Sequence, residues 1–156
     1  ACPTDAIKPW SVDATKCISY LTIEHRTLIE PTYFEAMGQW VYGCDICQEV
    51  CPHNQQSTRT SANPIHNAYQ ERFQSLNVLD VLNWSEEDRM RTFQGSSMKR
   101  AKLDMIRRNA IIVAGNLLQT EQNEEILQAI KVIAEDKAEG ELVRETAIEV
   151  LKIRHT

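Results

Sequence analysis

Hydrophobic and polar positions in the second half of the chain follow a helical pattern, with capping residues at the expected places. Ser85 to Asp88 has the form of a capped helix start. Gly95 to Ser97 interrupts the pattern and is predicted to cap a longer helix from about Met98 to Leu118. Asn123 and Gly140 punctuate two further helices. The apolar positions between these signals are expected to form a helical core.

The first half carries shorter elements. Asp13 is predicted to cap a helix over Ala14 to about Ile23, which carries a cysteine. Pro31 begins another short helix through Ala36, and Gly38 ends it. A later segment, residues 55–67, is rich in Gln, Ser, Thr, Asn and Pro, which is typical of a linker. We therefore expect two domains, residues 1–60 and 61–156.

A weak internal repeat lies in the second domain. The segment from Ile106 to Ile111 recurs 37 positions later, from Val143 to Ile148. That period suits stacked helical hairpins of the HEAT kind. Two copies are also compatible with a plain helical bundle.

The candidate chemistry lies in the stretch G-C-D-I-C-Q-E-V-C-P-H-N, residues 43–54. Cys44, Cys47 and Cys51 have C-x2-C-x3-C-P spacing, the second half of the run with which bacterial ferredoxins hold iron-sulfur clusters. In that run the cysteine before proline serves the neighbouring cluster. Structural zinc sites, dithiol redox motifs and buried unliganded cysteines are the alternatives.

A second Cys-Pro pair stands at the start of the chain, in A-C-P-T-D-A-I. In two-cluster ferredoxins this phrase closes the motif C-x2-C-x2-C-x3-C-P, so we expect a chain cut inside its first motif. Cys17 is then the candidate for the missing fourth ligand. The predicted ligand sets are Cys2, Cys17, Cys44 and Cys47 for one [4Fe-4S] cluster, and Cys51 for another.

Composition and charge narrow the class further. Among 156 residues, 42% are hydrophobic, and no apolar run approaches the ~20 residues of a membrane helix. The five cysteines do not form an even, secreted disulfide framework, so a reducing compartment is expected. The net charge of −5 argues against a general nucleic-acid binder. However, residues 99–108 hold five basic residues against one acidic residue, which is either a phosphate-binding patch or a solvated helix face.

Five phrases together resemble the C-terminal part of the epoxyqueuosine reductase family. They are A-C-P-T-D-A-I, K-C-I-S-Y-L-T-I-E-H-R, Y-G-C-D-I-C-Q-E-V-C-P-H-N, F-Q-G-S-S-M-K-R-A-K and R-R-N-A-I-I-V-A-G-N. The resemblance covers essentially the whole chain. It implies a cytoplasmic, cobalamin-dependent oxidoreductase with two [4Fe-4S] clusters that reduces epoxyqueuosine to queuosine in tRNA. It further implies an electron-donor protein as partner, and the chain is expected to be a monomer without membrane contact.

The resemblance also assigns residues. Ser19 and Asp45 would lie beside the cobalamin. The expected tRNA contacts are His25, Arg26, Lys99, Arg100, Lys102, Arg107, Arg108 and Asn109. No catalytic residue is expected here, because the family's catalytic acid lies in its N-terminal domain, and this chain alone is expected to be inactive. The implied fold class is mainly α: a truncated, ferredoxin-like double [4Fe-4S] module followed by a HEAT-like α-helical repeat domain.

Two other classes remain compatible with these residues. A reductive dehalogenase also couples two clusters to cobalamin, but has no evident use for a basic helical extension. A stand-alone ferredoxin-type electron-transfer module, with helices that bind a protein partner, is the other. Binding of tRNA discriminates between them and the reductase.

Overall fold

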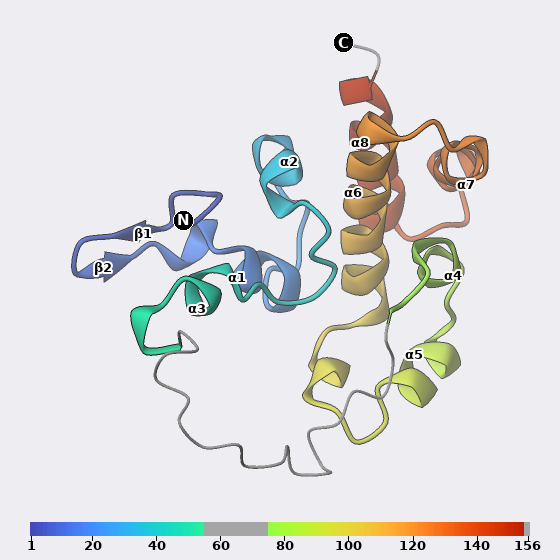
Figure 1. The fold of residues 1–156 in the computed structure, drawn as a ribbon. Coiled ribbons are helices and arrows are strands. Elements are labelled where there is room, and N and C mark those ends of the chain that lie inside the picture. The colour runs from blue at the N-terminus through green and yellow to red at the C-terminus, as the bar shows by residue number, and fades with distance from the viewer. Residues whose placement is uncertain (55–74, 155–156) are drawn as a thin grey trace.

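The computed structural model describes residues 1–54 and 75–154, and these residues form a mainly α-helical protein (Figure 1). Short elements make up the first range and longer helices the second. The expected linker and the domain boundary near residue 60 lie outside the described residues, so the division into two domains stays a prediction.

The N-terminal elements begin with a small antiparallel hairpin, in which Ile7 pairs with Val12. Asp13 caps the next turn as predicted, because its side chain accepts a hydrogen bond of 3.1 Å from the backbone N–H of Thr15. The single helix predicted over Ala14 to about Ile23 is wrong: the chain is extended at Cys17, and the α-helix begins only at Ile18. Gly38, with φ +53°, ends the turn that begins at Pro31. The elements are β1 (Ile7–Lys8), β2 (Ser11–Val12), a 3-10 turn (Ala14–Lys16), α1 (Ile18–Ile23), a 3-10 turn (Pro31–Tyr33), α2 (Phe34–Met37), α3 (Ile46–Glu49) and a 3-10 turn (Pro52–Asn54).

The second range confirms three of the predicted helix starts. Ser85 and Asp88 form a reciprocal capping box, and the Asn123 side chain accepts from the backbone N–H of Ile126 at 3.1 Å. Gly140 directly precedes the last helix. The elements are α4 (Val78–Leu82), α5 (Glu86–Thr92), a 3-10 turn (Ser97–Arg100), α6 (Leu103–Thr120), α7 (Glu124–Glu135) and α8 (Glu141–Arg154).

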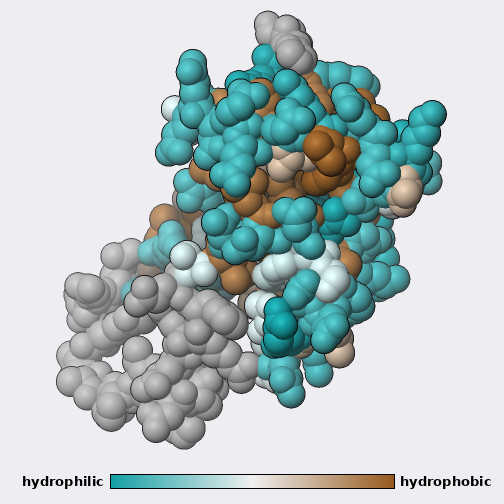
Figure 2. All heavy atoms as spheres, turned by 90° about the vertical axis from the view of Figure 1, so that its right-hand side faces the viewer, coloured by the Kyte–Doolittle hydropathy of each residue, from teal (hydrophilic) through white to brown (hydrophobic). Residues whose placement is uncertain are grey.

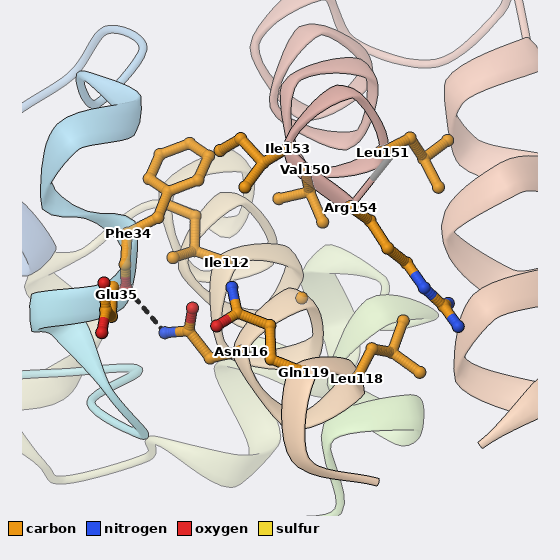
Figure 3. Close-up of a pocket in the computed structure, with 11 residues that line it drawn as sticks. Phe34, Glu35, Ile112, Asn116, Leu118, Gln119, Val150, Leu151, Ile153 and Arg154 are labelled. Carbon is orange, nitrogen blue, oxygen red and sulfur yellow. Dashed lines mark hydrogen bonds between the residues drawn. The ribbon is translucent and has the colours of Figure 1, made fainter. Parts of the chain in front are cut away.

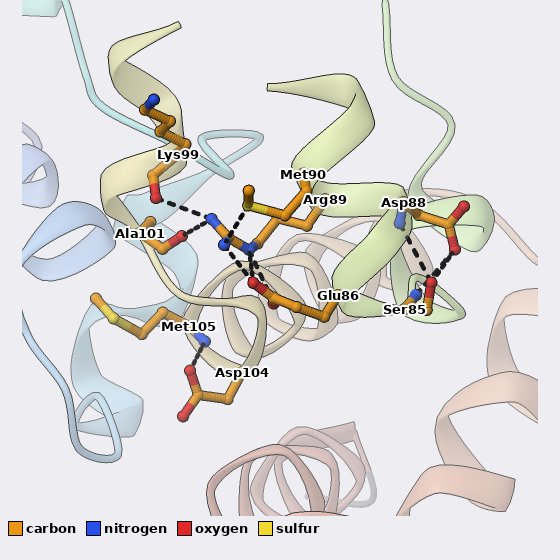
Figure 4. Close-up of polar contacts among 9 residues, drawn as sticks. All are labelled: Ser85, Glu86, Asp88, Arg89, Met90, Lys99, Ala101, Asp104 and Met105. Atoms are coloured by element: carbon orange, nitrogen blue, oxygen red, sulfur yellow. Dashed lines mark hydrogen bonds and ion pairs between the residues drawn. The ribbon is translucent and has the colours of Figure 1, made fainter. Parts of the chain in front are cut away.

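The long helix α6 begins later than predicted, at Leu103 rather than Met98. Ser96 caps only the 3-10 turn, and the chain is extended at Ala101 and Lys102. The cause is visible in Figure 4: Arg89 on α5 donates to the carbonyl oxygens of Lys99 and Ala101, at 2.8 and 3.1 Å. Those carbonyls accept hydrogen bonds from a side chain instead of from the backbone N–H groups of a continuing helix.

One hydrophobic core joins the two described ranges. Ile18, Leu21 and Phe34 belong to the same cluster of buried side chains as Ile106 and Ile112 on α6. Helix α6 packs on α8 and also contacts α1, α2, α4 and α7. The N-terminal elements are therefore held against α6 by continuous apolar packing, which places their cysteines relative to the helices.

Helices α6 and α8 approach closely at Gly115. An added Cβ there would lie 2.5 Å from Cγ1 of Val150, a stiff β-branched side chain that is 6% exposed. We expect Gly115→Ala to lower the melting temperature, because overpacking costs ~1–3 kcal/mol and outweighs the ~1 kcal/mol that alanine gains over glycine within a helix. Gly140→Ala is the control, since its Cβ would meet nothing within 4 Å. A higher melting temperature for Gly115→Ala would show that Val150 yields without cost.

The face made by α4, α5 and α7 is mostly hydrophilic, with hydrophobic side chains showing between the polar ones (Figure 2). Val132 on α7 is one of its exposed apolar residues. Among the described residues, no helix is both long enough and apolar enough to cross a membrane.

Candidate iron-sulfur site

Three separate segments bring cysteines to the site. Cys2 lies in the N-terminal turn, and Cys17 is the residue that precedes α1. Cys44 follows Gly43, whose φ of +75° directs the chain into the turn before α3, and Cys47 lies on α3. All of these thiols are free, and Cys47 is exposed while the others are partly buried.

Three other thiols affect the pKa of Cys44. Burial raises the pKa of the Cys44 thiol above its ordinary value. The negative charges of Cys17, Cys47 and Cys2 also raise the pKa of that thiol, against one hydrogen bond from the backbone of Ile46. Gathering thiolates is costly unless positive charge lies between them, and a bound iron-sulfur cluster would supply that charge.

Backbone donors surround Cys2. Burial on its own would raise the pKa of its thiol, but hydrogen bonds from Thr4, Ala6 and Ile7 outweigh it, so the pKa is lowered. Backbone N–H groups directed at a thiolate stabilise the form that binds metal, and hydrogen bonds to ligand sulfurs help to set cluster potentials. The donor set therefore fits an iron-sulfur cluster.

The spacing of the thiols bears on the zinc alternative. Among residues 1–54 and 75–154, no three His, Cys, Asp or Glu side chains converge closely enough to hold a single metal ion. Four sulfurs around one zinc, at ~2.3 Å each, lie much closer together than four sulfurs around a cubane. The two kinds of site are therefore distinguished by the distances between their sulfurs.

The other residues expected at the cofactors are close to these ligands along the sequence. Ser19 is partly buried on α1, and Asp45 is exposed at the start of α3. Cys51 follows α3, where its backbone N–H donates to the carbonyl of Gln48 at 3.2 Å. The assignments of Ser19 and Asp45 to cobalamin and of Cys51 to a second cluster stay predictions.

Two residues expected to contact tRNA are buried instead. Arg108 and Asn109 are both 0% exposed. Arg108 donates to the carbonyl oxygens of Leu21, His25 and Thr27, at 2.6 to 2.8 Å, and to the Asn109 side chain. Burial lowers the pKa of Arg108 to about 10, which still leaves it charged at neutral pH. The prediction that these two side chains lie along tRNA is wrong, because they are fully used inside the protein.

Arg107 is also largely occupied within the protein. Its guanidinium forms a bidentate pair with Glu139 at 2.7 and 2.9 Å and donates to the carbonyl of Leu82 at 2.8 Å. Both side chains of the pair are 16% exposed. Arg107 therefore ties α4 and the α7–α8 connection to α6 and offers little surface to a phosphate.

The remaining basic residues are accessible. Lys99, Lys102 and Arg26 are exposed, and Arg100 is exposed but pairs with Glu24 at 2.7 Å. His25 is partly buried and contacts the carbonyl of Leu28 at 3.1 Å. The accessible basic surface is thus smaller than the sequence indicated, and we define it as Arg26, Lys99, Arg100 and Lys102.

Arg89 supports this basic surface, although the sequence analysis did not single it out. It is 7% exposed, pairs with Glu86, and holds the carbonyls of Lys99 and Ala101 (Figure 4). The capping signal at Ser85 places α5, but nothing local shows that Arg89 points inward. The segment that carries Lys99 and Lys102 is therefore fixed by a buried arginine.

A pocket of about 470 Å³ lies away from the cysteines, between α2, α6 and α8 (Figure 3). Its lining is largely apolar, with Phe34, Ile112 and Val150 among the lining residues. Asn116 at its wall is already engaged, because it donates to the carbonyls of Phe34 and Gly38 at 2.7 and 2.8 Å. The pocket has no thiol in its lining and plays no part in the candidate site.

Comparison with known families identifies the N-terminal part of the chain as an iron-sulfur domain. Residues 1–54 match the family described as 4Fe-4S double cluster binding domain. The chain as a whole is related to the epoxyqueuosine reductases. The enzyme of Leadbetterella byssophila is 40% identical over 116 residues, and that of Francisella cf. novicida is 36% identical over 147 residues, or 92% of this chain.

Solved structures agree on the fold. A crystal structure of epoxyqueuosine reductase with a tRNA-Tyr epoxyqueuosine-modified tRNA stem loop matches 98% of this chain with a TM-score of 0.76 and 25% identity. A selenomethionine-labelled epoxyqueuosine reductase matches with a TM-score of 0.80 and 24% identity. The chain covers 39% of each of those chains, and 36% and 39% of the Leadbetterella and Francisella enzymes, so it spans little more than a third of their length.

Proposed function

We propose that this chain is the C-terminal part of an epoxyqueuosine reductase, an oxidoreductase that converts epoxyqueuosine to queuosine in tRNA. In this proposal Cys2, Cys17, Cys44 and Cys47 bind one [4Fe-4S] cluster, and Cys51 supplies a ligand to a second. The observation that carries the proposal is the match of residues 1–54, which hold all five cysteines, to a double [4Fe-4S] cluster family, in a chain related to these reductases. The whole enzyme acts in the cytoplasm, where thiols stay reduced and tRNA is present.

The part that this chain plays is to hold and orient cofactors. When bound, the clusters and cobalamin supply the electron transfer that removes the epoxide oxygen. Hydrogen bonds from Thr4, Ala6 and Ile7 favour the thiolate form of Cys2, whose pKa is lowered. Ser19 and Asp45, close to the ligands along the sequence, offer polar side chains to the cobalamin.

The helices contribute the tRNA-binding part in this proposal. The relative solved with a modified tRNA stem loop supports it. Arg26, Lys99, Arg100 and Lys102 are the accessible cations, and phosphate contacts of this kind fix an RNA in register without reading its sequence. We also propose that α6 to α8 form HEAT-like hairpins, because α8 packs on both α6 and α7.

Charge reversal on the basic surface tests the tRNA part. We expect Lys99→Glu combined with Lys102→Glu to weaken binding of a tRNA anticodon stem loop. The slope of log affinity against log salt concentration should fall by about one unit for each phosphate contact that is lost. Both lysines are exposed, and neither forms an ion pair with any residue that the structure describes. Fluorescence anisotropy across a salt titration measures both quantities.

The matched control is Lys131→Glu combined with Lys137→Glu, which changes the charge equally on α7 and in the connection after it. Its affinity and salt slope should stay close to those of the unaltered chain. Equal losses in the two double variants would mean that net charge, and not the basic surface, governs binding.

A further inference from the structure

A buried threonine links the two segments that carry Cys17 and Cys44. Thr22, on α1, is 0% exposed. Its hydroxyl donates to the carbonyl of Ile18 at 2.8 Å and accepts from the backbone N–H of Gly43 at 3.0 Å. Ile18 directly follows Cys17, and Gly43 directly precedes Cys44. One hydroxyl, with one donor and two acceptor positions, therefore connects the neighbours of two thiols.

Asn109 on α6 fixes the same two segments from the other side. Its side-chain amide donates to the carbonyls of Thr22 and Val41, at 2.9 and 2.8 Å. Its oxygen accepts from Arg108 at 2.8 and 3.0 Å, so the amide has only one orientation that satisfies all its partners. Among the described residues, no buried side-chain polar atom lacks a partner. A fully satisfied buried network of this kind is rigid.

Gly43 is the point at which this network meets the cluster ligands. Its φ of +75° is a conformation that only glycine adopts without strain. This backbone conformation sets the direction of the chain at Cys44. Without the Thr22 hydroxyl as acceptor, the backbone N–H of Gly43 would lose its hydrogen-bond partner inside the protein. The ligand loop would then settle in a different position, and cluster properties depend on the position and hydrogen bonding of the sulfurs.

We propose that Thr22 and Asn109 are positioning residues for the cluster: they hold Cys17 and Cys44 in fixed relation to each other and to helix α6. This inference rests on the proposed binding of a cluster by the four cysteines. It adds a link between the helices, which would carry tRNA, and the site of electron transfer.

Replacing Thr22 tests the inference on the full chain, reconstituted anaerobically with ferrous iron and sulfide. Thr22→Val keeps the shape of the side chain and removes the hydroxyl, whereas Thr22→Ser keeps the hydroxyl. Thr146→Val is the matched control, since Thr146 is also a fully buried helix threonine that donates to the carbonyl four residues earlier, at 2.7 Å from Leu142. The readouts are iron content, the electron paramagnetic resonance spectrum of the reduced cluster, its midpoint potential and the melting temperature.

We expect Thr22→Val to lose iron, or to retain a cluster with a shifted spectrum and midpoint potential. Thr22→Ser should keep the spectrum of the unaltered chain, and Thr146→Val should change only the melting temperature. An unchanged spectrum and potential in a folded, cluster-bearing Thr22→Val chain would overturn the inference. If Thr22→Val does not fold, Asn109→Asp, which retains the Arg108 contact and loses both amide donations, replaces it with the same expectations and the same overturning result.

The result also separates this inference from the proposed function. An unaltered chain that takes up no iron and sulfide would overturn the proposed cluster, and with it the positioning role. If the unaltered chain binds a cluster, and the spectrum and midpoint potential of that cluster do not change when Thr22 or Asn109 is replaced, only the positioning role is overturned.

Discussion

Replacing Cys17 by serine is expected to abolish the iron-sulfur cluster of this chain, whereas replacing Cys51 by serine is expected to leave it. Cys17 stands directly before α1, and its charge acts on the Cys44 thiol. Each iron of a [4Fe-4S] cluster takes one thiolate, so the loss of a ligand exposes an iron and the cluster decays. Cys51 belongs in our proposal to a second cluster, and its loss removes no ligand from the first.

Iron and sulfide content after anaerobic reconstitution and desalting measures this contrast, together with visible absorption. The unaltered chain and Cys51→Ser should retain about four irons per chain, the content of one cubane, and Cys17→Ser should retain almost none. Equal losses in the two variants would contradict the division of the cysteines. Stoichiometric zinc without visible absorption, in a chain that takes up no iron, would establish the zinc alternative instead.

The candidate ligands could largely be predicted from the sequence, because ligand spacing is a local property. The C-x2-C-x3-C-P run and the Cys-Pro pair at the start define three of the four thiols, and the fourth followed by elimination. In the structure, the charges of Cys2, Cys17 and Cys47 raise the pKa of the Cys44 thiol, and their assignment as cluster ligands stays a prediction. Helix starts could also be predicted where a side chain caps them, as at Ser85 and Asn123.

The basic run was misread because charge along a sequence does not show the direction of a side chain. Arg108 lies three residues after Met105 and four before Ile112, and both of these are buried on α6. That helical spacing was the signal available for an inward-facing arginine. Its acceptors are carbonyls more than 80 positions away along the chain, and no local pattern reveals such partners.

The start of α6 was misplaced for a related reason. Ser96 and Ser97 resemble a helix cap, and Ser96 does cap a turn by accepting from the N–H of Met98 at 3.1 Å. The turn ends early because Arg89 binds the next free carbonyls. Tertiary hydrogen bonds thus override the local helix preference. As a result, Lys99 and Lys102 lie on an irregular segment before α6.

Replacing Arg108 by methionine is expected to destabilise the protein by ~3–5 kcal/mol, the range for removing one partner of a buried charged network. The substitution leaves the buried carbonyl of Leu21 without its donor, which costs ~1–3 kcal/mol, and it also removes the donor from the partly buried carbonyls of His25 and Thr27. Relief of the desolvation of a buried charge offsets part of that sum. Urea denaturation gives the free energy of unfolding for the variant and the unaltered chain.

Arg100→Met is the control for Arg108→Met, because it makes the same change at a side chain that is 70% exposed and has a surface ion pair with Glu24. Its expected cost is at most ~1 kcal/mol, the usual range for exposed pairs. For tRNA affinity, the order of the two variants should be the reverse of their order for stability. At equal folded fraction, Arg100→Met should weaken tRNA binding, and Arg108→Met should not. A stable Arg108→Met chain with reduced tRNA affinity would contradict the buried role of this arginine, since only a side chain that reaches the RNA gives that combination.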